Sequence, residues 1–132
     1  MKIFTAYIHE NRYGLGIILL AAIFLLPFLG AFPLIDPDEP VYGQTAREML
    51  AAGDWLSPRI YGQFWYDKPP LFYWLEMISY SLFGISDYTS RLPSAVMGIA
   101  TVATVYVQSR AVFNKHIAFR AALILLTSVG FI

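Results

Sequence analysis

Residues 13–40 read YGLGIILLAAIFLLPFLGAFPLIDPDEP, an uncharged, mostly apolar run that ends in a cluster of carboxylates. The apolar part, residues 13–35, is long enough to cross a bilayer, because about 20 apolar residues cover a hydrocarbon core of roughly 30 Å. Asp36, Asp38 and Glu39 are therefore expected at a membrane surface, where a charge is costly unless it is hydrated, paired or used. Bilayer physics alone makes this cluster a candidate functional site.

The composition of the chain indicates a membrane protein. Of its 132 residues, 58% are hydrophobic and 14% are charged, and the mean hydropathy is +0.56, whereas charged residues make up about 25% of an ordinary soluble domain. The net charge is zero, which argues against a nucleic acid bound through its phosphates. The chain has no cysteine and two histidines far apart, so disulfides and cysteine-based zinc sites are excluded and a histidine-rich metal site is not expected.

The apolar stretches predict an all-α integral membrane fold with two complete transmembrane helices and the start of a third. After the first span, residues 92–109 lie between Arg91 and Arg110 without any charge and form the second, with Pro93 tolerated in its first turn. Residues 121–132 begin a third apolar helix, which meets no cap or turn signal. The pattern is typical of an N-terminal piece of a longer multi-pass protein.

The first apolar run is expected to remain as a signal anchor. It exceeds the 7–15 apolar residues of a cleaved signal peptide, and its exit lacks a small-x-small cleavage pattern. Residues 1–12 and 110–120 together carry five basic residues and one acidic residue, whereas residues 36–91 carry four basic and eight acidic residues. The positive-inside rule then places the N-terminus and the inner loop 110–120 in the cytoplasm, and the loop 36–91 outside.

The outer loop 36–91 is predicted to contain two short juxtamembrane helices. One covers about residues 40–52, where a proline and an acidic pair are placed to start it. The other covers residues 71–83 and is apolar almost all round, with Glu76 as its single charge. At a length of roughly 20 Å it is too short to span a bilayer. We expect it to lie in the interface, its aromatic side chains against membrane lipids.

Two motifs in this loop resemble the polyprenyl-phosphate-dependent glycosyltransferases, which include the bacterial aminoarabinose transferases that modify lipid A and the protein O-mannosyltransferases. The first motif is DEPVYG at residues 38–43, with REML at 47–50 and GDW at 53–55, and the second is YDKPPLFYW at 66–74. The resemblance covers about residues 15–132. It implies a large multi-pass enzyme of the GT-C fold in which the two loop helices roof an active site.

The resemblance also implies the chemistry. The donor would be a sugar carried on a polyprenyl phosphate, and the acceptor a lipid, glycan or protein hydroxyl, in an inverting transfer at the outer face of a bacterial inner membrane. Asp38 matches the family's catalytic aspartate, a general base or positioning group for the acceptor hydroxyl, and Glu39 stands beside it as a second catalytic candidate. Lys68 matches the lysine that meets the phosphate, whose developing charge an ammonium would stabilise.

The chain departs from the family pattern at one phosphate contact. Val41 stands where the aminoarabinose transferases carry an arginine, and Arg59 or Arg47 is the candidate to replace it. Asp67, where a glutamate is common, and Tyr42 complete the candidate substrate-binding residues. No cofactor is implied. A divalent cation at Asp38 stays open, because Asp36 adds an Asp-x-Asp pattern, although this class of donor needs no nucleotide.

Each candidate also has a structural interpretation. Asp38 and Glu39 could simply cap a helix, and Lys68 could extend its ammonium to the interface. The joint occurrence of both motifs after a predicted span favours function. The alternative function is a non-catalytic membrane subunit or scaffold that holds a lipid headgroup with Lys68 and the aromatic helix at residues 71–83. A fragment of this length is not expected to catalyse by itself.

Overall fold

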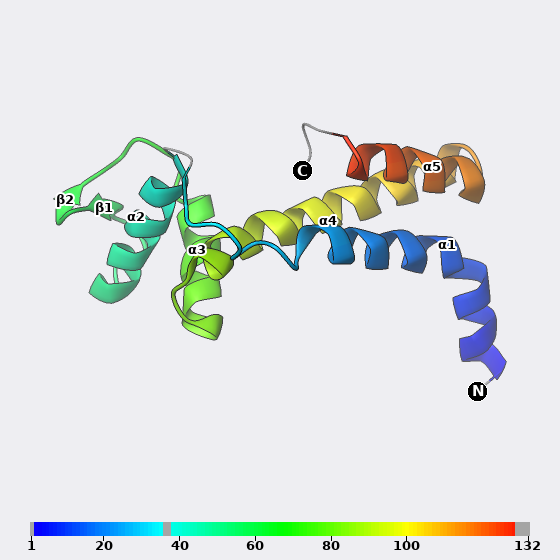
Figure 1. Cartoon of the computed structure of the whole chain (residues 1–132), viewed down its shortest axis with the longest axis horizontal. Helices are drawn as coiled ribbons and strands as arrows, with labels where there is room; N and C mark the ends of the chain where they lie inside the picture. The colour runs from blue at the N-terminus through cyan, green and yellow to red at the C-terminus, as the bar shows by residue number, and fades with distance from the viewer. Residues whose placement is uncertain (1, 36–37, 129–132) are drawn as a thin grey trace. The chain divides into compact units, whose positions relative to one another are not determined.

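The structure is a computed structural model that describes residues 2–35 and 38–128. Asp36 and Pro37, from the carboxylate cluster, lie outside the described residues. Figure 1 labels the elements in chain order, which are α1 (Lys2–Leu25), α2 (Asp38–Ala52), β1 (Arg59–Ile60), β2 (Gln63–Phe64), α3 (Leu71–Phe83), α4 (Asp87–Val112) and α5 (Lys115–Leu126). They form two compact units. One consists of the chain up to Pro27 together with the chain from Ala95 onward, and the other consists of Phe28–Ser94.

The helices predicted within the loop are present as α2 and α3. Helix α2 begins at Asp38, with Asp38 and Glu39 in its first turn, where negative charge complements the positive end of the helix dipole. Helix α3 covers the predicted residues 71–83 and ends at Gly84, whose φ of 82° suits glycine. Their position relative to a membrane stays a prediction.

The other helices differ in extent from the predicted spans. Helix α1 ends at Leu25 rather than at residue 35, because Pro27 has no N–H to continue the hydrogen-bond ladder and disfavours the helical conformation of the residue before it. Helix α4 begins at Asp87 rather than at residue 92, because the side chains of Ser86 and Thr89 each accept a hydrogen bond from the other's backbone N–H, a reciprocal N-terminal cap.

The predicted inner loop 110–120 is largely helical. Helix α4 continues to Val112, and α5 begins at Lys115 instead of at residue 121. The side chain of Asn114 accepts hydrogen bonds from the backbone N–H groups of His116 and Ile117, so it caps the helix and leaves only a short turn.

One helix among the described residues, α4, is long and apolar enough to cross a membrane, and the apolar part of α1, Arg12–Leu25, is shorter. The predicted count of two complete spans and the start of a third is therefore not confirmed. Only 17% of the most apolar window of α4 is buried, so this chain does not enclose the helix as it would the core helix of a soluble protein. Exposed apolar side chains of this kind fit a lipid or helix neighbour.

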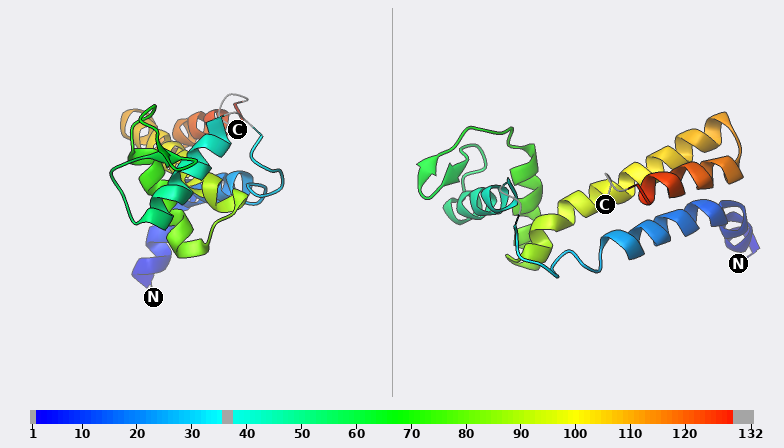
Figure 2. Two further views of the ribbon diagram at one scale, coloured as in Figure 1. Left: turned by 90° about the vertical axis from the view of Figure 1, so that its left-hand side faces the viewer. Right: turned by 45° about the horizontal axis from the view of Figure 1, so that its top comes forward.

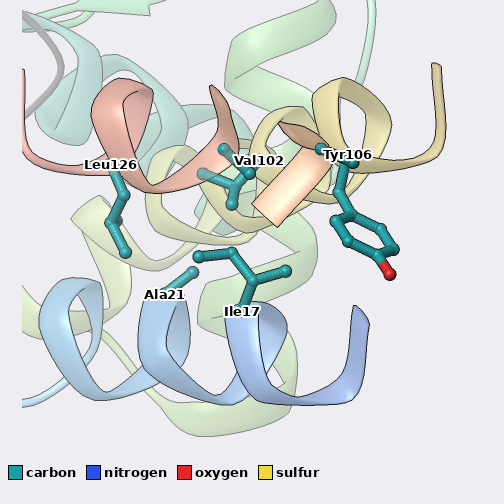
Figure 3. Packing of buried hydrophobic residues seen from close by; sticks show 7 residues of the cluster. Ile17, Ala21, Val102, Tyr106 and Leu126 are labelled. Atoms are coloured by element: carbon teal, nitrogen blue, oxygen red, sulfur yellow. The ribbon is translucent and has the colours of Figure 1, made fainter. Parts of the chain in front are cut away.

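In the unit formed by α1, α5 and the later turns of α4, the core consists of small and branched side chains together with the ring of Tyr106. Figure 3 shows Ile17 and Ala21 of α1 facing Val102 and Leu126, and Figure 2 shows α5 running back along α4. At Gly14 the ring of Tyr106 approaches so closely that an added Cβ would lie 2.8 Å from Tyr106 Cε1. A larger residue at this position would force the Tyr106 ring or the helix to shift.

The Phe28–Ser94 unit is built on α2 packed against α3. Its buried core residues are Ala46, Met49, Tyr73, Met77 and Tyr80. The first turns of α4 join this unit through a buried hydrogen bond of 2.6 Å between the hydroxyl groups of Tyr80 and Ser90. The last turns of α3 and the start of α4 are thereby held together.

The expectation of an all-helical chain needs one correction, since residues 59–64 form an antiparallel hairpin in which Ile60 pairs with Gln63. The two turn residues, Tyr61 and Gly62, both have positive φ, at 52° and 76°, as a type I′ turn requires. Their backbone N–H groups donate to the Glu48 carboxylate of α2, which ties the hairpin to that helix.

Candidate active site

The Phe28–Ser94 unit contains a cavity of about 250 Å³ beside the first turns of α2. Its polar lining comes from three helices and comprises Asp38, Glu39, Tyr42, Glu76, Ser90, Arg91 and Ser94. Its apolar lining includes Leu34 and Phe72. A concave site with a few convergent polar groups is the usual form of a small-ligand site.

The structure brings Asp38 and Lys68 together across thirty residues of sequence. The ammonium of Lys68 donates a hydrogen bond of 3.1 Å to Asp38 Oδ2, and the Tyr42 ring centroid lies 5.2 Å from Lys68 Nζ, within cation–π range. The hydrogen bond to Asp38 raises the pKa of Lys68, so the lysine stays positively charged. The two sequence motifs thus meet at one edge of the cavity.

Glu39 is paired with Arg91 at the start of α4. Arg91 donates to both carboxylate oxygens, from Nε at 2.9 Å and from Nη2 at 2.7 Å, and this bidentate geometry is the strong form of the pair. The hydrogen bond from Arg91 lowers the pKa of Glu39. Because both oxygens are engaged, the geometry favours a positioning role for Glu39 over a role as general base.

Arg91 also binds the segment that leads into α2. Its Nη1 donates to the backbone carbonyls of Leu29 and Phe32, each at 2.7 Å, and its Nη2 donates to that of Pro33 at 3.0 Å. The residues before α2, Glu39 within it and the start of α4 are therefore joined through one guanidinium. In the sequence, Arg91 is recognisable only as the charged residue before the predicted transmembrane helix.

Glu76 lines the cavity and, like Arg91, is not among the site residues predicted from the sequence. Its side chain is 2% exposed, and Oε2 is buried without a hydrogen-bond partner among residues 2–35 and 38–128. Burial, and then the nearby Glu39 carboxylate, raises the pKa of Glu76 to about 8. The available signal was a single glutamate on an otherwise apolar helix, since a charged residue is almost never fully buried without a partner.

The remaining candidates lie away from the cavity. Arg59 donates to Asp54 at 2.6 Å and lies over the ring of Phe64, so the structure does not bring it to Lys68. Arg47 and Asp67 are exposed on the surface and do not line the cavity. In the described part of the chain, no three acidic or histidine side chains gather as a metal site would need, so the geometry adds no support to a cation at Asp38.

Comparison with known proteins decides the family. Residues 67–132, half of the chain, match the family described as dolichyl-phosphate-mannose-protein mannosyltransferase. The chain belongs to this family. The resemblance to polyprenyl-phosphate-dependent glycosyltransferases drawn from the two motifs is thereby confirmed.

Two curated relatives are named as transferases of an aminosugar. The undecaprenyl phosphate-alpha-4-amino-4-deoxy-L-arabinose arabinosyl transferase of Pseudomonas savastanoi pv. phaseolicola is 34% identical over 126 residues, which is 93% of this chain and 24% of the relative. The corresponding transferase 2 of Proteus mirabilis is 34% identical over 125 residues, 89% of this chain and 22% of the relative. The chain thus spans about a quarter of the length of these relatives.

Two solved structures of ArnT from Cupriavidus metallidurans are similar in fold. The apo structure has a TM-score of 0.77 at 27% identity, over 89% of this chain and 22% of that one. The structure bound to undecaprenyl phosphate has a TM-score of 0.74 at 28% identity, over 82% of this chain and 20% of that one. The described helices therefore resemble part of a membrane transferase.

Proposed function

We propose that this chain is part of a membrane glycosyltransferase that moves a sugar from a polyprenyl phosphate to the hydroxyl group of a lipid, glycan or protein. The observation that carries the proposal is the hydrogen bond between Asp38 and Lys68 at the edge of the cavity. The names of the relatives support an undecaprenyl-phosphate-linked donor. The ArnT structure bound to undecaprenyl phosphate supports a site for the lipid phosphate.

In the proposed reaction, the acceptor oxygen forms a bond to the anomeric carbon as the bond from that carbon to the phosphate oxygen breaks. Asp38 accepts the proton of the acceptor hydroxyl, and the polyprenyl phosphate leaves with the bonding electrons. Attack from the face opposite the phosphate inverts the anomeric carbon. Lys68 stabilises the negative charge on the leaving phosphate, while Glu39, fixed by Arg91, holds the start of α2 in place.

The pairing of Asp38 with Lys68 is compatible with both roles. The Lys68 side chain is 30% exposed and that of Asp38 is 66% exposed, and surface ion pairs contribute little to stability. A phosphate, which offers several strong acceptor oxygens, can therefore draw the ammonium from the carboxylate at little cost. Asp38 then faces the acceptor.

The charge distribution supports an orientation for the proposed site. Residues 36–91 carry more acidic than basic residues, and the segments on either side carry more basic ones. Under the positive-inside rule, the cavity faces the periplasm of a bacterial inner membrane and the N-terminus faces the cytoplasm.

Lys68→Met in the full-length protein is expected to weaken binding of undecaprenyl phosphate by roughly 10- to 150-fold, because a hydrogen bond to a charged group is worth about 1.5–3 kcal/mol. Lys68→Arg keeps the positive charge and should lose less. Binding is measured by titration of the purified protein in detergent micelles. Lys115→Met, which removes a lysine in the other unit, is the matched control and should bind as the unaltered protein does. Equal affinity of Lys68→Met and the unaltered protein would remove Lys68 from the phosphate site.

A further inference from the structure

Glu76 is a buried carboxyl group for which the proposed reaction has no use. It lines the same cavity as Asp38 and Glu39, yet it is 2% exposed and its Oε2 has no partner in the described part of the chain. A buried polar group without a hydrogen bond is destabilising. An unsatisfied group of this kind in a native fold calls for a ligand or another specific cause.

Packing does not supply that cause. The two other cavity carboxylates have cationic partners, Asp38 in Lys68 and Glu39 in Arg91. The neighbours of Glu76 on the same helix include Tyr73 and Met77, which are buried in the core between α2 and α3. An apolar side chain of similar size would pack there without a desolvation cost. The carboxyl group is therefore better explained by what enters the cavity.

We propose that Glu76 binds a hydroxyl group of the sugar that the polyprenyl phosphate carries. The inference rests on the proposed function, since it takes the donor from there. A volume of about 250 Å³ lies below the roughly 300–1,000 Å³ of drug-sized sites, so it suits a single sugar ring and not a polyprenyl chain. The sugar ring is bonded directly to the phosphate group, so it must lie close to the phosphate-binding candidate Lys68. The cavity begins at Asp38, which accepts a hydrogen bond from Lys68.

The protonation state of Glu76 matches a hydroxyl ligand. With the pKa raised to about 8 by burial and by Glu39, the group is mostly a neutral acid at pH 7 and offers one O–H donor together with acceptor oxygens. A sugar hydroxyl also donates and accepts. Above pH 8 the group becomes a carboxylate that can only accept. The charged and titratable groups around it are Asp38, Glu39 and Tyr42 from α2, Arg91 from α4, and Tyr73 and Tyr80 on its own helix.

The test compares two variants of the full-length protein, Glu76→Leu and Glu76→Gln, on three lipids: undecaprenyl phosphate, and the same lipid carrying mannose or 4-amino-4-deoxy-L-arabinose. The readout is the affinity for a sugar-loaded lipid divided by that for the bare lipid. Glu76→Leu should lower this ratio about tenfold or more, the value of one lost hydrogen bond, and leave binding of the bare lipid unchanged. Glu76→Gln, whose amide also donates and accepts, should keep most of the ratio.

A pH series separates this contact from a structural role. In the unaltered protein the ratio for the mannose lipid, which has no amine, should fall as pH rises through 8, and in Glu76→Gln it should stay constant. Glu76→Leu should melt at a higher temperature than the unaltered protein, because it removes an unsatisfied buried group. If Glu76→Leu does not fold, the proposal is still tested by comparing the pH dependence of the ratio in the unaltered protein and in Glu76→Gln.

Three results would overturn the proposal: no preference of the unaltered protein for either loaded lipid, an unchanged ratio in Glu76→Leu, or an equal loss in both variants, which would point to a charged carboxylate. Failure of the unaltered protein to bind even bare undecaprenyl phosphate would instead overturn the proposed function.

Discussion

Replacing Asp38 with asparagine in the full-length protein is expected to lower kcat for sugar transfer by roughly 10²–10⁴-fold, the usual contribution of a general base. The amide occupies the space of the carboxylate but cannot take the proton of the acceptor hydroxyl. Transfer is measured with undecaprenyl phosphate carrying a radiolabelled sugar, in membranes that contain the acceptor.

The fold should survive this change. The Asp38 side chain is 66% exposed, and an ion pair at the surface contributes little to stability, so losing the pair with Lys68 should not unfold the protein. Asp87→Asn makes the same chemical change at the first turn of α4, outside the cavity, and should leave transfer intact. Full activity of Asp38→Asn would remove Asp38 from the catalytic role.

Arg91→Met is expected to lower the free energy of unfolding by roughly 2–3 kcal/mol, the scale of lost hydrogen bonds to a charged group. The substitution removes the two bonds to Glu39 and the three to backbone carbonyls before α2. Denaturant unfolding in detergent micelles measures the change. Arg47→Met, at an exposed position of α2, is the matched control and should lie within about 0.5 kcal/mol of the unaltered protein.

This loss should depend on pH in a defined direction. Arg91 lowers the pKa of Glu39 below its usual 4.5, so the stabilisation by the pair is fully present above that value and is lost as pH falls through the lowered pKa. The difference between Arg91→Met and the unaltered protein should therefore be largest near neutral pH and shrink below pH 4.5. A difference that stays constant to low pH would show that Arg91 acts only through the backbone carbonyls.

Local signals in the sequence account for the helices that were predicted well. Two prolines before residue 71 and Gly84 after residue 83 bound α3 on both sides. Apolar composition alone predicted α1 poorly, because residues 26–35 are as apolar as the helix but contain Pro27 and Pro33, which interrupt it. The start of α4 was missed because its cap depends on two hydroxyl side chains, which are common in loops as well.

The part of the candidate site that belongs to the two sequence motifs could be predicted from the sequence. Asp38 and Lys68 were paired on motif spacing, and the structure brings them into contact. The pairing of Glu39 with Arg91 joins residues 52 apart, and the burial of Glu76 depends on how α2 packs on α3. Both are tertiary consequences that no local pattern in the sequence contains.

The proposed site is tested most directly by the location of the lipid phosphate in a solved structure of the full-length protein with undecaprenyl phosphate. We expect a phosphate oxygen within hydrogen-bond distance of Lys68 Nζ, with the cavity beside Asp38 left open for the sugar. A phosphate bound elsewhere, with Lys68 still held by Asp38, would contradict the proposed site.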